Sequence, residues 1–346
     1  MRIGVDAMGG DSPLTKPIAG AVQAANDFGI DIVLYGDESQ IRGVLKQHRF
    51  NPVKVDVVHC TEVVEMHESP ALALRQKKQS SIRIALNDLQ SGEVSAMISA
   101  GNTGAVMATA KFVLKVIEGI ERPAIATLMP SILRNQPFVL LDIGANTDCK
   151  PLYLVQFAVM GDAYSRLLQH LDEPRIGLLN IGEESGKGDS VVRDTYPLLE
   201  QSTLKFVGNV EGKAMYKGAA DVIVCDGFVG NMTLKVAEGT FDLVRNVIKQ
   251  EVSRSWLSKL GYLGMRGAFQ ALKDRADYTE VGGAPLLGVN GTVIICHGNS
   301  TPRTLRNAIR HAHECAQLKL NDLIAREVSD NLEVMRSARE LEEAAS

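Results

Sequence analysis

Small and polar residues that could bind an anion occur together at residues 99–105, with the sequence Ser-Ala-Gly-Asn-Thr-Gly-Ala. Gly101 and Gly104 permit positive φ angles and a close approach of a ligand to the backbone. Asn102 and Thr103 add side-chain hydrogen-bond donors without bulk. The run therefore suits a phosphate-like group, although a tight connection that binds nothing would use the same residues.

Residues 93–98 are typical of a short buried strand, and residues 105–116 carry apolar side chains at helical spacing. A helix that begins after this strand would direct free N–H groups at a bound anion. Glycine with Asp, Asn, His or Lys follows five more predicted strands, in residues 9–11, 142–146, 183–187, 226–231 and 297–299. Because open α/β sheets bind ligands at the carboxyl ends of their strands, these six loops predict one shared anion-binding active site.

Strand and helix patterns alternate along the chain, which predicts βαβ units. Strands are predicted at residues 2–7, 32–35, 53–60, 93–98, 121–129, 136–143, 175–181, 204–208, 220–225 and 291–296. Helices are predicted at residues 18–28, 39–48, 105–116, 152–171, 190–201, 233 onward and 303–324. We expect one three-layer α/β/α domain with a mostly parallel sheet over residues 1–320, possessing no clean internal boundary, followed by a charged, helical or frayed tail over residues 321–346.

Composition restricts the class of protein. The net charge of −4 gives no electrostatic reason to expect nucleic acid as a partner. Five cysteines form no CxxC pair, which predicts reduced thiols in the cytoplasm. No Cys/His cluster has zinc spacing, so neither a metal nor a cofactor is expected. The N-terminus lacks a signal-peptide pattern, and no run approaches 18 apolar residues, so we expect a soluble protein.

The loops contain no recognised nucleophile motif. GxSxG, Walker A and GxGxxG are all absent, and Lys187, although it lies among glycines, lacks the Ser or Thr that follows a P-loop lysine. The predicted site therefore positions ligands and stabilises charge. The nucleophile would be a ligand, for which inorganic phosphate is suitable.

Six ordered motifs closely resemble those of the PlsX family, the phosphate acyltransferases of bacterial phospholipid synthesis. The resemblance extends from residue 1 to about residue 315, and the tail after about residue 320 matches nothing in the family pattern. The motifs are Asp6-Ala7-Met8-Gly9-Gly10-Asp11, residues 99–105, Asp142-Ile143-Gly144-Ala145-Asn146, Asn180-Ile181-Gly182-Glu183-Glu184 with Lys187-Gly188, residues 226–231, and residues 288–291 before His297-Gly298.

The resemblance implies transfer of a long fatty acyl chain from acyl carrier protein to inorganic phosphate. The acyl-phosphate product would be used by a membrane-bound glycerol-3-phosphate acyltransferase. It also implies a homodimer and a fold similar to phosphotransacetylases and to the isocitrate and isopropylmalate dehydrogenases.

We assign hypothetical roles on this basis. The N–H groups and side chains of Asn102 and Thr103 would hold phosphate, and Lys187 would supply mobile positive charge. Asn146 and Asn231 would donate to the thioester oxygen. Asp226 would orient Lys187 or a donor, and His297 would protonate the leaving thiol. The remaining residues expected to line the binding site are Gly10, Asp11, Gly101, Gly104, Glu183 and Gly230.

Structural roles compete with each assignment. Lys187 could instead bridge Glu183 or Glu184, and His297 could be a hydrogen-bonded residue at a strand end. Asn146, Asn231 and Asp11 could simply cap turns or helices.

Residues 249–275 combine basic and apolar side chains. Trp256, Leu260 and Leu263 recur at helical spacing, and Met265 and Phe269 continue the pattern between Lys249 and Lys273. Such a segment suits an anionic bilayer surface, and it would place the protein peripherally on the cytoplasmic membrane. A dimer interface, a buried hairpin or contact with the acidic carrier protein would use the same pattern.

Two other functions remain open from the sequence. A short-chain phosphotransacetylase acting on acyl-CoA would share these loops but lack a long apolar channel. A non-catalytic membrane scaffold of the same fold would bind its partners without the loops. A dehydrogenase is disfavoured because no dinucleotide motif and no acidic metal cluster is evident.

Overall fold

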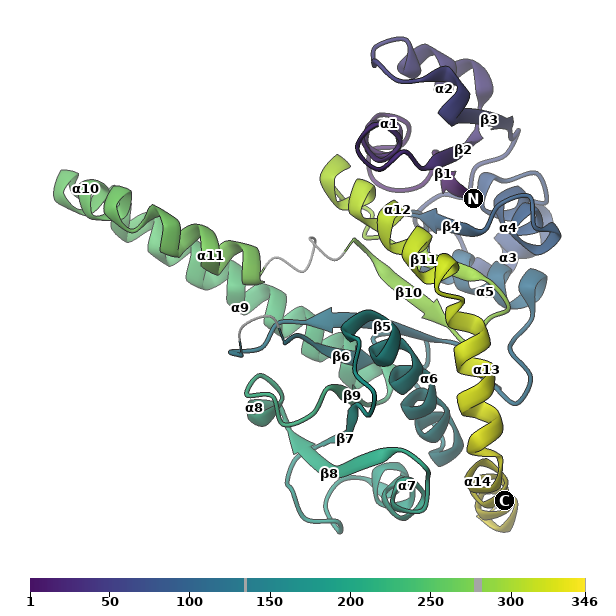
Figure 1. Cartoon of the computed structure of the whole chain (residues 1–346), viewed down its shortest axis with the longest axis vertical. Helices are drawn as coiled ribbons and strands as arrows, with labels where there is room; N and C mark the ends of the chain where they lie inside the picture. Colours follow the sequence, from purple (N-terminus) through teal and green to yellow (C-terminus); the bar gives the residue numbers. More distant parts are fainter. Residues whose placement is uncertain (134–135, 277–281, 346) are drawn as a thin grey trace.

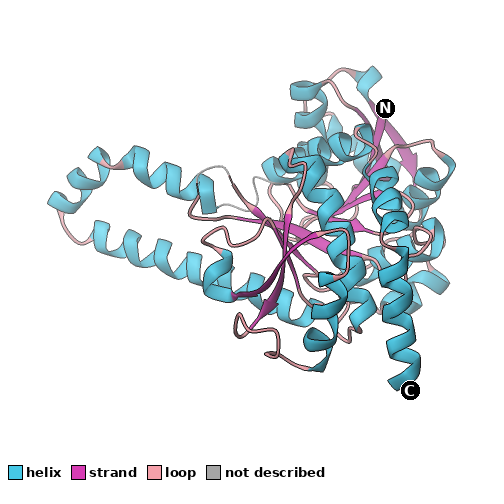
Figure 2. Ribbon diagram, turned by 60° about the horizontal axis from the view of Figure 1, so that its bottom comes forward, coloured by secondary structure: helices cyan, strands magenta, loops and turns pink. Residues whose placement is uncertain are grey.

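The computed structural model of the chain describes residues 1–133, 136–276 and 282–345. An eleven-stranded sheet forms the centre, in the order β3-β2-β1-β4-β11-β10-β5-β6-β9-β7-β8, and helices cover its faces (Figures 1 and 2). Most strand pairs are parallel. The predicted three-layer α/β/α fold is confirmed.

The first half of the sheet contains five parallel strands with alternating apolar residues on two faces. They are β1 (Arg2–Asp6), β2 (Asp31–Gly36), β3 (Val55–His59), β4 (Ala96–Ser99) and β11 (Thr292–Ile295). Ile3 and Ile32 pack in one buried cluster with α1 (Thr15–Phe28) and α12 (Pro302–Gln317). On the opposite face, Val33 and Met97 pack in a second cluster. The helices on that face are α4 (Ser81–Ser91) and α5 (Thr103–Leu114).

The second half of the sheet has its own parallel strands. They are β6 (Phe138–Leu141), β9 (Val222–Val224), β7 (Arg175–Asn180) and β8 (Lys205–Glu211). Helices α6 (Pro151–Gln169) and α7 (Ser190–Glu200) pack against one face. The other short elements of the chain are α2 (Glu38–Leu45), the 3₁₀ turn Pro52–Lys54, α3 (Pro70–Gln76) and α8 (Gly212–Met215).

Two strands in the middle reverse the direction of the sheet. β10 (Ala284–Leu287), which the sequence analysis missed, pairs antiparallel with both β11 and β5 (Ala124–Met129). β5 in turn pairs antiparallel with β6, as expected for the strands predicted at residues 121–129 and 136–143. The second half therefore runs opposite to the first, so the six loops follow strands of both directions.

Two helix boundaries differ from the prediction. α9 (Gly227–Ser253) begins at Gly227 rather than at Thr233, because Asp226 caps it and its glycines did not break the helix. The helix expected over residues 303–324 is two helices, α12 and α13 (Leu320–Asp330), separated at Lys319, which has a left-handed φ of 54°.

The C-terminal tail is helical in α13 and α14 (Leu332–Ala345), and Ser346 lies outside the described residues. Ile324, Val328 and Met335 are buried in the same apolar cluster as the residues of α6. The tail thus adds to the core of the second half.

A helical hairpin projects from the body of the protein (Figures 1 and 2). α9 forms the outgoing arm, and α10 (Trp256–Gly264) with α11 (Arg266–Ala276) forms the returning arm. The hairpin contains the predicted surface segment, whose side chains from Leu272 onward lie outside those described. None of the helices in the described ranges has both the length and the apolar character needed to cross a bilayer.

Candidate functional site

The loops that follow β1, β4 and β11 contact one another through their backbones. Asp11 N donates a hydrogen bond to Gly298 O at 2.8 Å. A Cβ added to Gly9 would lie 2.6 Å from Gly101 N, and one added to Gly10 would lie 2.9 Å from Gly298 O. Side chains are thus sterically excluded where these loops meet. We call residues 9–11, 99–104 and 297–299 the first loop group.

The buried carboxyl group of Asp6, at the end of β1, holds the first loop group through hydrogen bonds. Ser99 Oγ donates to Asp6 Oδ2 at 2.7 Å, and Gly101 N donates to Ser99 Oγ at 3.0 Å. Met8 N donates to Asp6 Oδ1 at 3.1 Å. Burial raises the pKa of Asp6, and these donors oppose the rise. The sequence analysis assigned no role to Asp6 or Ser99, although an acid just before the Gly9-Gly10 turn was a usable signal.

Asn102 is a structural centre of the first loop group. Its Oδ1 caps α5 by accepting from Ala105 N at 3.0 Å, and its Nδ2 donates to Met66 O at 2.9 Å and to Glu68 O at 2.8 Å. Its amide is therefore occupied within the protein. The segment around residues 65–68 therefore lies against this group.

Backbone N–H groups remain for a ligand. Thr103 and Gly104 form the first turn of α5, where N–H groups have no intrahelical acceptor. The Thr103 side chain is exposed, and a Cβ on Gly104 would lie 2.7 Å from the Pro70 ring. The helix dipole makes this turn favourable for an anion.

An exposed imidazole belongs to another loop of the same group. His297 Nδ1 accepts from Asn299 N at 3.2 Å, so the neutral ring carries its proton on Nε2. Asn299 Oδ1 accepts from Lys16 Nζ at 2.9 Å, which fixes the turn from outside. His297 can therefore present an Nε2–H donor next to Gly298.

A second loop group, residues 142–146 and 226–231, forms where β6 and β9 end. The buried Asp142 accepts at Oδ1 from Ile125 N, Gly144 N and Ala145 N, at 3.0, 3.2 and 3.0 Å. Its Oδ2 accepts from Asn146 N at 2.7 Å and from Asn146 Nδ2 at 3.0 Å. Burial raises the pKa of Asp142, and the donors oppose that rise. Asp142 thus organises the loop, a role that the sequence analysis did not assign.

Asn146 connects this loop to its neighbours. Its Nδ2 also donates to Pro123 O at 2.8 Å, so both amide hydrogens are used inside the protein. Its main-chain oxygen accepts from Gly227 N at 2.7 Å. In this conformation Asn146 positions the loop and has no side-chain hydrogen left for a ligand.

The start of α9 completes the second loop group. Asp226 Oδ1 caps the helix by accepting from Phe228 N and Val229 N, at 2.8 and 2.9 Å. Gly230 packs directly on the backbone of Asp142. Asn231 is exposed, and its amide has no hydrogen-bond partner among the described residues. Of the two asparagines predicted as donors, Asn231 is the one that a ligand can reach.

A third loop group, residues 180–188, follows β7. Asn180 Nδ2 donates to Lys187 O at 3.0 Å, and Asn209 Nδ2 donates to Glu184 O at 2.8 Å. Lys187 and Glu183 are exposed. Within the described part of the chain, no carboxylate lies within salt-bridge distance of Lys187 Nζ, so neither Glu183 nor Glu184 neutralises it here.

The three groups belong to two halves of the sheet. The first follows strands of the first half, and the other two follow strands of the second half, which run the opposite way. Ile143 and Ala145 of the second group nevertheless pack against the apolar cluster that contains Ala105 and Val106 of α5. The helix that starts in the first group therefore shares a core with the second.

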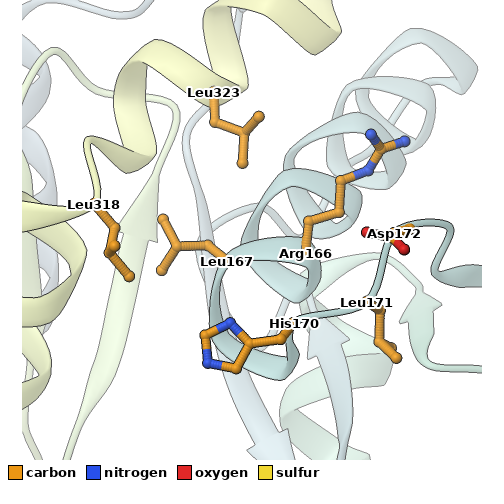
Figure 3. A pocket seen from close by; sticks show the side chains of 7 residues that line it. All are labelled: Arg166, Leu167, His170, Leu171, Asp172, Leu318 and Leu323. Atoms are coloured by element: carbon orange, nitrogen blue, oxygen red, sulfur yellow. The ribbon is translucent and has the colours of Figure 1, made fainter.

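Two cavities lie apart from the loop groups. One, of about 610 Å³, lies within the hairpin. The other, of about 450 Å³, lies between the end of α6 and the α12–α13 junction, where Leu167 faces Leu318 and the Arg166 guanidinium points away from His170 (Figure 3). Arg166 is paired there with the buried Asp162 at 2.7 Å and with Glu327 at 3.3 Å.

The fold is that of an α/β protein similar to phosphotransacetylases. The structure resembles the EutD phosphotransacetylase from Staphylococcus aureus, with a TM-score of 0.60 at 15% identity over 91% of this chain and 94% of that chain. It also resembles a 4-hydroxythreonine-4-phosphate dehydrogenase from Klebsiella pneumoniae, with a TM-score of 0.53 at 14% identity over 92% of this chain and 99% of that chain. The predicted likeness to the phosphotransacetylase fold is confirmed, and the second of these structures adds a dehydrogenase.

Sequence comparison gives the family. The family model described as "Fatty acid synthesis protein" matches residues 1–323. The phosphate acyltransferase of Pelobacter propionicus is 47% identical over 331 residues, which cover 96% of this chain and 95% of that protein. The chain belongs to this family, the PlsX family of phosphate acyltransferases, as its motifs predicted.

Proposed function

We propose that the protein transfers a long-chain fatty acyl group from acyl carrier protein to inorganic phosphate and so forms acyl-phosphate. A membrane glycerol-3-phosphate acyltransferase would consume this product. The observation that carries the proposal is the first turn of α5, whose free N–H groups lie in one loop group with the His297 imidazole. In the proposed reaction, an anion held at this turn would be served by His297 as the proton donor.

The chemistry requires little more than positioning and charge stabilisation. A phosphate oxygen attacks the thioester carbonyl, the tetrahedral oxyanion collapses, and the C–S bond breaks. His297 Nε2–H protonates the departing thiolate. Asn231 donates to the developing oxyanion, and Lys187 offsets the charge of phosphate.

The other predicted residues support this arrangement. Thr103 and Gly104 bind phosphate through their N–H groups, with Gly10, Asp11 and Gly101 beside them. Asn102 and Asn146 hold the loops through their own hydrogen bonds. Asp226 and Gly230 position the start of α9, and the exposed Glu183 lies in the same loop group as Lys187.

Release of free thiol from acyl-carrier protein in the presence of phosphate tests the proposal. Lys187→Ala should raise KM for phosphate at least tenfold, a loss of about 1.4 kcal/mol of binding. Lys213→Ala is the matched control, because Lys213 pairs with Glu211 beside the same loop. Activity with acetyl-CoA alone would instead support a short-chain phosphotransacetylase. No activity with either donor would support a scaffold.

Peripheral membrane binding is part of the proposal. Trp256, Leu260 and Leu263 are 69%, 55% and 62% exposed on α10, at the far end of the hairpin (Figure 2). Phe269 is half-buried, stacks on Tyr262 of the same arm with ring centroids 4.8 Å apart, and lines the cavity between the two arms. The exposed residues with basic neighbours suit an anionic bilayer surface.

Flotation with anionic liposomes tests this contact. Leu260→Glu should abolish flotation, since a carboxylate cannot enter the acyl region cheaply. Val53→Glu is the control, because Val53 is equally apolar and 88% exposed on the body of the protein. Equal flotation of both variants would refute the proposal that the hairpin contacts the membrane.

A homodimer is supported by the outer face of α9. Met232, Val236, Leu243 and Val247 are exposed and fall along one side of the helix. Such a row is typical of an interface that a second copy covers. Sedimentation of Val236→Glu with Leu243→Glu should show monomers where the wild type shows dimers.

A further inference from the structure

We propose that the cavity inside the hairpin binds one long acyl chain that ends in a phosphate group, and that it receives acyl-phosphate from the candidate site. This inference rests on the proposed function, since it names where the product goes. The cavity measures about 610 Å³, within the range of about 300–1,000 Å³ that is common for small-molecule sites.

The lining of the cavity is apolar on both arms. α9 contributes Phe241, Ile248 and Val252, which recur at helical spacing and face inward. The returning arm contributes Tyr262 and Phe269, whose stacked rings form the opposite wall. A flexible alkyl chain fits such a lining because burial of each CH₂ group contributes about 0.8 kcal/mol.

Positive charges surround this apolar lining. Lys249, Lys259 and Arg266 line the cavity, and none of them has a carboxylate within salt-bridge distance among the described side chains. Arg245 also lines it and is paired with Asp242 at 3.1 Å. Three unneutralised cations beside an apolar channel complement an amphiphile with an anionic head, and a phosphate dianion is the head group that the proposed reaction produces.

One helix links the candidate site, the cavity and the tip. α9 starts at the second loop group, and Phe241 lies ten residues beyond Asn231, about 15 Å along the helix. The cavity lining on α9 ends at Ser253, three residues before the exposed Trp256. An acyl chain that leaves the site along α9 therefore enters the cavity before it reaches the hairpin tip.

Binding of hexadecyl phosphate, a stable analogue, tests the inference. The probe is used below its micelle-forming concentration and without vesicles, so that membrane binding plays no part. We expect one saturable site per chain by calorimetry and a blue shift in the fluorescence of Trp256, which is the sole tryptophan and lies in the sequence between the lining residues Ser253 and Lys259. Octyl phosphate should bind at least tenfold more weakly.

Three variants locate the site. Lys259→Glu combined with Arg266→Glu should weaken binding at least tenfold through charge repulsion, and Val252→Phe should weaken it by filling the cavity. Arg254→Glu is the matched control, since Arg254 pairs with Glu251 and does not line the cavity. It should bind like the wild type. Unchanged circular dichroism and melting temperature verify that each variant is folded.

The inference is overturned if the charge-reversed variant binds as tightly as the wild type, or if both chain lengths bind equally. It is also overturned if binding falls as protein concentration rises, because a second copy would then occupy the cavity. Thiol-release assays on the same samples separate the two proposals. If the protein forms acyl-phosphate but does not bind hexadecyl phosphate, only the proposed role of the cavity is refuted. If it binds the probe but does not transfer acyl groups, the proposed function is refuted.

Discussion

Gly230 lies directly against the main-chain carbonyl of Asp142, so that a Cβ added to Gly230 would come within 1.9 Å of Asp142 O. The first turn of α9 thus docks on the end of β6 without any intervening side chain. A Cβ on Gly227 would likewise lie 2.6 Å from Asn146 O. The second loop group can form only if these helix positions lack side chains.

Gly230→Ala should therefore destabilise the protein and displace the start of α9. Overpacking of this kind costs about 1–3 kcal/mol, and a clash with backbone lies at the upper end of that range. Gly239→Ala, on the same helix, is the control, because the added Cβ would point into open space with no neighbouring group within 4 Å. It should stabilise by about 0.5–1 kcal/mol through helix propensity. Urea unfolding measures both, and equal stabilities would contradict the packing argument.

Asn102→Asp should open the segment around residues 65–68. The carboxylate keeps the cap on Ala105 N but faces Met66 O and Glu68 O, which now receive no donor. A lost buried hydrogen bond of this type costs about 1–3 kcal/mol. Hydrogen exchange in residues 65–68 should accelerate. Asn51→Asp is the comparison, since Asn51 Oδ1 only caps Val53 N at 3.1 Å, and there we expect little change.

His297→Asn should lower acyl transfer without disturbing the turn. The asparagine oxygen can replace Nδ1 as the acceptor of Asn299 N, but the Nε2–H acid is lost. General acid catalysis contributes about 10²–10⁴-fold, and we expect a loss in that range. The loss should shrink with thioesters of low-pKa thiols, which need no proton to depart. A rate within about threefold of wild type would exclude His297 as the acid.

The buried Asp162 should make stability depend on pH. Burial raises its pKa to about 7, with Arg166 opposing and Glu327 adding to the rise, whereas the unfolded value is about 3.9. The folded state therefore binds the extra proton between these values, and this stabilisation is lost as pH rises through 7. Burial lowers the pKa of His311 to about 4, which gives the opposite slope between pH 4 and 6.5.

A difference measurement isolates Asp162 from His311. The unfolding free energy of Asp162→Asn minus that of wild type should increase from pH 4 to 7 and level off above, because only the wild type loses a bound proton. Denaturant unfolding across this pH range provides the values. A difference that stays constant with pH would show that Asp162 is ionised in both states.

Much of the first loop group could be predicted from the sequence. The run at residues 99–105 was expected to join a strand to a helix, and β4 and α5 confirm it. Glycine spacing and apolar periodicity are local signals, because they reflect φ preferences and the burial of one face. The helix break at Lys319 carried no such signal, since a non-glycine residue adopts a left-handed φ there.

The sequence by itself determined the family, the α/β alternation and the set of chemically competent loops. Only the tertiary structure decided which loops meet, because strand direction depends on pairing between distant segments. Pro285 of β10 pairs with β11, and the same strand pairs with β5 about 160 residues earlier in the chain, which reverses the second half of the sheet. The structure also decided that the amide hydrogens of Asn102 and Asn146 are donated to neighbouring carbonyl and carboxylate oxygens, whereas those of Asn231 have no such acceptor among the described residues. Hydrogen-bond partners of this kind are set by proximity in the folded chain.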